Sequence, residues 1–332
     1  MLFLLLLTAQ LELWLTYVFC YAFVLFYIDP FVYYKRSALF VKQLSSNLDV
    51  NGMAVCDNRI FVIGISSSTV EVYDTASYDQ LQTLSVNAMT DPWDIAASPN
   101  EPYLYVLEGV HQLLRLDLSG RIVTSWMLDG TQCALSISRS SSIVVTYGDR
   151  LEEFDNVGKI LRSVRFDRTI SHASHSLCVC ADNFLLCHGS GRISVQHLVC
   201  RVDREGRILD RYRESGADVY QPIHLAVAEH GCVLVVDVNN RRVQILNEQL
   251  SRSHDLVSTR GERAWPLRVC YDPPRGNVYV STLDGNVLVF HVRSRSSSVQ
   301  AGYLEVRSGF IATFTGHLTD VKCDCMDSIE DT

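Results

Sequence analysis

Apolar and polar residues alternate with a period of two over much of the chain, most clearly between Pro222 and Leu246. Two alternating segments flank an acidic turn that contains Gly231, and a third apolar run follows a polar break at residues 239–242. A period of two places one face of each segment inward and predicts strands. We therefore expect three consecutive antiparallel strands, which form too small a sheet to be stable alone in water.

The same strand-turn-strand unit occurs six times along the chain. Aligned on one apolar position each, the units follow one another at steps of 42, 40, 42, 48 and 44 residues. The aligned positions are Met53, Ile95, Leu135, Leu177, Leu225 and Val269. A period in the low forties is about the length of a four-stranded propeller blade, and no 3.6-residue apolar pattern indicates helical repeats. The sequence predicts an all-β, six-bladed β-propeller over residues 37–293.

The fifth unit carries a more specific motif. Asp237, Asn240, Arg242 and Val243 follow a first strand that begins with a proline and a turn that contains a glycine. This segment resembles the NHL repeat, in which an apolar strand ends in Asp and leads into an Asn-(His/Arg)-Arg-apolar segment. The resemblance implies an NHL-like propeller. Many such propellers follow RING, B-box and coiled-coil modules in tripartite-motif ubiquitin ligases, and the sequence shows none of these modules.

Residues 1–36 differ in kind from the repeats. Glu12 is the only charged residue from Met1 to Ile28, and aromatic residues and then Lys35 and Arg36 follow the apolar stretch. This length and these flanks predict a transmembrane helix with the propeller on the cytoplasmic side. A cleaved signal peptide is disfavoured because a basic n-region and a small-residue cleavage site are missing. As a further alternative, the leader belongs to an upstream reading frame and the propeller is simply cytoplasmic.

Two segments are candidates for the strand that closes the ring. Residues 38–44 alternate weakly and directly precede the first unit, and we assign them to the last blade, so that no sheet edge is exposed. Residues 303–315 in the tail are the alternative. Residues 294–332 otherwise comprise a Ser-rich break and an acidic tail.

Composition limits the chemistry. The net charge of −8 disfavours nucleic-acid binding driven by overall charge. The 11 cysteines lack a convincing metal-binding pattern, because pairing across the turn at residues 181–183 sets Leu177 opposite Cys187, on the other face from Cys178 and Cys180. Buried free cysteine behaves as a small apolar residue. We expect no cofactor and no metal.

Catalytic motifs are missing from the sequence, which contains no nucleophile elbow, no His-Glu-x-x-His and no phosphate-binding loop. Some NHL-like propellers are enzymes, such as the peptidyl-amidating lyase, which holds zinc with histidines in its central channel. A site of that kind needs three convergent histidines, for which the candidates are His111, His175 and His224. In the alignment of the six units, no two of the three fall at equivalent blade positions, so we assign no catalytic residue.

Recognition is the remaining function. In a propeller, the loops before the first strand and between the second and third strands meet on one face. Arginine and tryptophan, which are enriched at binding hot spots, occur in these loops. The predicted binding residues are Trp93, Arg150, Arg192, Asn239, Asn240, Arg241 and Trp265.

Some of these residues have a structural alternative. Asn240 and Arg242 are expected mainly to stabilise the blade turn, and Trp93 and Trp265 adjoin prolines and could pack between blades. We predict a non-catalytic interaction scaffold whose partner is a protein. The alternatives are an RNA-binding propeller or ubiquitin-pathway substrate adaptor, and a lyase-like or lactonase-like enzyme with a metal in the channel.

Overall fold

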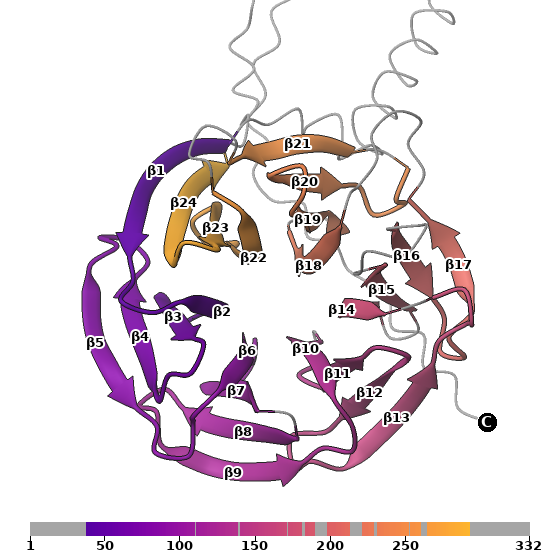
Figure 1. Ribbon diagram of the computed structural model, residues 1–332, viewed down its shortest axis with the longest axis horizontal. Helices are drawn as coiled ribbons and strands as arrows, with labels where there is room; N and C mark the ends of the chain where they lie inside the picture. Colours follow the sequence, from indigo (N-terminus) through magenta and orange to yellow (C-terminus); the bar gives the residue numbers. More distant parts are fainter. Residues whose placement is uncertain are drawn as a thin grey trace, which may run out of the picture. The chain divides into compact units, whose positions relative to one another are not determined.

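The protein is described by a computed structural model that covers residues 38–292, apart from 110, 139, 171, 181–182, 190–197, 213–220, 229–230, 252 and 260–263. Its strands form six four-stranded antiparallel sheets arranged as the blades of a propeller around a central channel (Figure 1). The predicted all-β, six-bladed architecture is therefore confirmed.

Each blade comprises four strands, which follow one another from the channel outward. Blade 1 is β2 (Val50–Cys56), β3 (Arg59–Gly64), β4 (Thr69–Asp74) and β5 (Gln80–Ser85). Blade 2 is β6 (Pro92–Ala97), β7 (Tyr103–Glu108), β8 (Gln112–Asp117) and β9 (Ile122–Met127). Blade 3 is β10 (Gln132–Ile137), β11 (Ile143–Tyr147), β12 (Arg150–Phe154) and β13 (Ile160–Arg165).

The remaining blades follow the same order. Blade 4 is β14 (Ala173–Cys180), β15 (Asn183–His188), β16 (Leu198–Val202) and β17 (Ile208–Arg211). Blade 5 is β18 (Pro222–Val227), β19 (Val233–Asp237), β20 (Arg242–Leu246) and β21 (Ser253–Ser258). Blade 6 is β22 (Pro266–Asp272), β23 (Asn277–Thr282), β24 (Asn286–Val292) and β1 (Ala38–Ser45).

Strand β1 closes the ring, as the sequence predicts. It pairs antiparallel with β24 from Ala38 opposite Val292 to Ser45 opposite Asn286, so the last blade combines the two ends of the repeat region. Leu44 is buried, and the ring of Phe40 packs edge-on against Phe290. This pairing covers the edge of β24 that would otherwise face solvent. The alternative closing segment, 303–315, lies outside the described residues.

The core is divided into six apolar clusters, each shared by two neighbouring blades. The second and third strands of each blade supply most of the fully buried residues, because both of their faces meet an adjacent blade. The outermost strands β5, β9, β13 and β17 are largely exposed. No blade has a core of its own, and stability therefore depends on closure of the ring.

A repeated turn joins the third and fourth strands of blades 2, 3 and 4. Asp117, Asp155 and Asp203 each accept hydrogen bonds from the main-chain N–H groups two and four residues later. The glycine three residues after each aspartate has a positive φ, between 78° and 87°, which an L-residue adopts only with strain. The Asx-Gly turn is thus the clearest local repeat in the chain.

The hydrophobic leader at residues 1–36 and the tail at 294–332 both lie outside the described residues, so the transmembrane helix stays a prediction. Within the part of the chain that the structure describes, no helix is long and apolar enough to span a membrane.

Candidate functional site

Every inner strand has a β-bulge near its start, and the residue after this bulge occupies the same level in all six blades. In each blade the register with the second strand shifts by one residue between two pairs, for example between Pro92 and Asp94 or between Pro222 and His224. Bulges re-aim the side chain that follows them. The six residues at this level are Gly52, Asp94, Ala134, His175, His224 and Arg268.

Four of these six positions carry polar or titratable side chains, and two of them accept a main-chain N–H from the next blade. Asp94 Oδ2 accepts the main-chain N–H of Leu135 at 2.9 Å, and His224 Nδ1 accepts that of Val269 at 3.4 Å. Leu135 and Val269 each follow the equivalent residue of the neighbouring blade. In blade 1 the position is glycine, where a Cβ would lie 3.0 Å from the main-chain nitrogen of Ile95.

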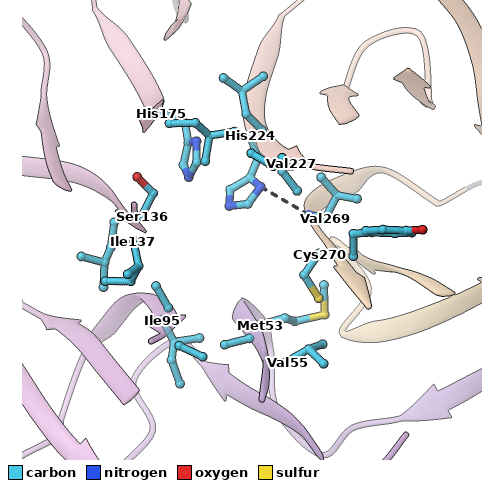
Figure 2. A pocket seen from close by; sticks show the side chains of 18 of the residues that line it. Met53, Val55, Ile95, Ser136, Ile137, His175, His224, Val227, Val269 and Cys270 are labelled. Carbon is cyan, nitrogen blue, oxygen red and sulfur yellow. Dashed lines mark hydrogen bonds between the residues drawn. The ribbon is translucent and has the colours of Figure 1, made fainter. Parts of the chain in front are cut away.

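His175 and His224 lie side by side, with ring centroids 4.1 Å apart and planes inclined by 42° (Figure 2). Burial, together with the positive charge of Arg268, lowers the pKa of His175 to about 3, although a hydrogen bond with the Leu135 main chain acts in the opposite direction. Burial, His175 and Arg268 also lower the pKa of His224. Both imidazoles are therefore neutral at physiological pH, and an unprotonated imidazole nitrogen can bind a metal ion.

Asp94 and Arg268 complete the polar level. Asp94 is 1% exposed, and its Oδ1 lies 3.9 Å from Arg268 Nε while accepting the N–H of Ile95 at 3.0 Å. Burial raises the pKa of this carboxyl group, whereas Arg268 and the two N–H donors lower it. A terminal nitrogen of Arg268 also lies 3.5 Å from Asn51 Oδ1 in blade 1 and 3.5 Å from the main-chain oxygen of Trp93 in blade 2. The guanidinium thus links three neighbouring blades near the start of their inner strands.

A pocket of about 320 Å³ occupies the channel on the other side of this level. Its walls come from the second halves of all six inner strands and are mainly aliphatic, with His175 and His224 side by side among the lining residues (Figure 2). Val55, Ile137 and Val227 are partly exposed, which places the opening at the end where the inner strands finish. We call this end the C-terminal face and the opposite end, which carries Trp93, the N-terminal face.

The structure gives two of the predicted binding residues a direct contact. The guanidinium of Arg241, in the turn between β19 and β20, lies 4.2 Å from the ring centre of Trp265. Asn240 and Arg242 instead hold the turn, because both donate to Asp237 Oδ2, at 2.8 and 2.9 Å. This geometry matches the structural alternative for Asn240.

Three other predicted binding residues, Arg150, Trp93 and Asn239, are distributed over the N-terminal face. Arg150 packs on the ring of Tyr147 and pairs with Glu152 at 3.1 Å, so its guanidinium makes contacts within blade 3. Trp93 is 43% exposed, and Asn239 is also exposed. Arg192 lies outside the described residues. These side chains belong to one face through the antiparallel topology, but they do not converge on the channel pocket.

Two sequence-based expectations about the histidines need correction. His175 and His224 do occupy equivalent blade positions, and Cys187 pairs with His175, whereas Leu177 pairs with Leu185. The alignment on Leu177 is one residue out in blade 4, where the equivalent of Leu225 is Ser176. His111 lies on the exposed turn between β7 and β8, where its Nδ1 lies 3.1 Å from Gly130 O.

Sequence reasoning missed Asp94 and Arg268. One pattern marks them: they stand two residues after the prolines that begin β6 and β22, as His224 does after Pro222. Counting from these prolines, rather than from the apolar positions, aligns the three side chains at one level. In blade 4, Ala173 replaces the proline, which hides His175 from the same count.

Comparisons with known proteins give information on the fold and none on the function. No protein-family model matches the chain. No curated protein matches it either. Among solved structures, a chain titled Kuenenia stuttgartiensis Hydrazine Synthase is similar with a TM-score of 0.55 at 11% identity, over 75% of this chain and 97% of that chain. At this identity the likeness shows the fold alone.

Proposed function

We propose that the protein is an NHL-like propeller that acts as a non-catalytic binding module, and that it holds an apolar side chain of a protein partner in its channel pocket. The observation that carries this proposal is the pocket itself, about 320 Å³ in volume and lined mainly by aliphatic side chains from six blades, with Ser136, His175 and His224 among its polar residues. Binding sites are typically concave and mostly apolar, with a few polar groups that fix orientation.

The size of the pocket favours a protein partner. Its volume is at the low end of the range for small-molecule sites, about 300–1,000 Å³, and suits one or two large side chains as an anchor. Such anchors dominate the energy of protein interfaces when they enter a desolvated pocket.

The described arginines favour RNA less. In the strip from Arg201 to Arg211, Arg207 pairs with Asp203 at 2.7 Å and with Glu205 at 2.9 Å. Arg211 donates to Thr169, and Arg201 to the main chain of Glu248. Ion pairing therefore compensates part of the positive charge that contacts to phosphate would need.

The experiment is a selection of a displayed random peptide library against the full chain, followed by affinity measurements on single variants. Val55→Asp and Val227→Asp put a charge at the opening of the pocket and should weaken a selected peptide by at least about tenfold, since an unpaired buried charge costs more than about 1.4 kcal/mol. Trp93→Ala and Arg241→Ala, on the N-terminal face, are the matched controls.

The two faces give opposite outcomes. Peptides with an apolar anchor, sensitive to the pocket variants and insensitive to the controls, support the proposal. Peptide binding that is lost in Trp93→Ala or Arg241→Ala and retained in the pocket variants would move the interface to the N-terminal face. RNA binding that weakens steeply with salt, without any peptide enrichment, would replace the protein partner with RNA.

A further inference from the structure

We propose that Asp94, His175 and His224 form a binding site for one divalent transition-metal ion beside the channel pocket. Among the described residues, these three side chains are the group whose potential ligand atoms come together, all within 4.8 Å of one another. They come from β6, β14 and β18, at the level that follows the bulges. The site is independent of the protein partner proposed above.

His175 is prepared to bind a metal. Its Nδ1 is buried without a hydrogen-bond partner, while the ring bonds to the Leu135 main chain. An unpaired buried nitrogen costs free energy that a ligand would recover. A metal-binding histidine usually donates its other ring N–H to a carbonyl or carboxylate group, which fixes the orientation of the ring. In His175 the ring is already held in place through its other nitrogen, which leaves Nδ1 open to an ion.

The other two ligands require small adjustments. Around a zinc ion with bonds of about 2.0–2.1 Å, tetrahedral ligand atoms lie about 3.4 Å apart, so the three donors must close by no more than about 1.4 Å. The Asp94 carboxylate keeps lone pairs beyond those used by Ile95 and Leu135. Coordination through His224 Nδ1 displaces a main-chain hydrogen bond of 3.4 Å, which is long.

The donor set indicates the class of ion. Two imidazoles and one carboxylate suit zinc and neighbouring ions such as cobalt, nickel and ferrous iron, rather than calcium or magnesium, which prefer oxygen. Three protein ligands leave at least one coordination position. Both histidines line the pocket, so water or an oxygen ligand can approach the site from the pocket.

Arg268 opposes the ion and gives a second test. Its Nε lies 3.9 Å from Asp94, without a hydrogen-bond partner, and adds a positive charge beside the site. Replacement of Arg268 with the uncharged Met should therefore tighten metal binding several-fold, because like charges repel strongly in a low-dielectric interior. Adventitious binding at surface residues would not respond in this way.

The experiment titrates the full chain, after treatment with a chelator, with Co²⁺ and follows its visible absorption, with Zn²⁺ as competitor. We expect one ion per chain. His175→Gln and His224→Gln should each weaken binding by at least about a hundredfold, beyond the effect of losing an outer-shell partner. His111→Gln, which changes an exposed histidine, is the matched control and should bind as the wild type does.

Thermal melts with and without Zn²⁺ give a second, independent measure of metal binding. An ion at a hundred times its Kd stabilises the folded protein by about 2.7 kcal/mol, so the wild type should melt higher with Zn²⁺, and Arg268→Met should show the larger upward shift at equal concentration. Binding that persists in both His175→Gln and His224→Gln, or the absence of a one-to-one Co²⁺ complex in the wild type and in Arg268→Met, would overturn the assignment.

Discussion

The Asp237–Arg242 pair decides whether the NHL-like motif of blade 5 is structural or functional. Asp237 is fully buried, and the Arg242 side chain is 13% exposed. Arg242 Nε donates to Asp237 at 2.9 Å, while Nη1 reaches Asp255, whose side chain is 53% exposed. The motif thus joins one buried contact and one surface contact through a single guanidinium.

The two contacts differ in energy. Arg242→Met removes one partner of a buried ion pair, which typically costs about 3 kcal/mol or more. Asp255→Ala removes a largely exposed partner and should cost less than about 1 kcal/mol. A loss of about 3 kcal/mol lowers the Tm of a propeller of this size by about 6 to 12 °C.

Urea unfolding followed by tryptophan fluorescence measures these differences. Adding Asp237→Asn in a double-mutant cycle separates the pairwise energy from the cost of truncation, and we expect a coupling of about 1–3 kcal/mol. The reasoning is refuted if Arg242→Met is no less stable than Asp255→Ala. In that case the Arg242 guanidinium contributes little to the stability of the fold. Loss of partner binding by a stable Arg242→Met protein would then make it a recognition residue.

Three further predictions concern closure, turns and thiols. Deletion of residues 38–45 exposes the edge of β24 and should replace the cooperative melt by aggregation in light scattering, whereas a chain beginning at Ala38 should melt normally. Gly206→Ala places a Cβ 1.8 Å from Arg165 O and should cost more than about 2 kcal/mol in urea unfolding, against about 1 kcal/mol for Gly109→Ala, where φ is +54° and space is open. Burial raises the pKa of Cys200 to about 12, so iodoacetamide at pH 8 should alkylate it about a thousandfold more slowly than in urea, as mass spectrometry can measure.

The sequence alone determined the architecture. Period-two alternation and steps near 42 residues are local and repeated, so six units were countable without any knowledge of tertiary contacts. The closing role of residues 38–44 followed from the need to cover a sheet edge. The structural alternative for Asn240 came from its place in the motif, and its side chain donates a hydrogen bond to Asp237.

Tertiary structure alone decided the candidate site. Asp94, His175, His224 and Arg268 come from four blades and are separated by more than forty residues at each step, so only ring closure brings them to one level. In blade 4 no proline marks the bulge, and a one-residue slip there transfers His175 from one face of its strand to the other. Periodicity predicts which residues form strands, whereas the register between strands decides which side chains meet.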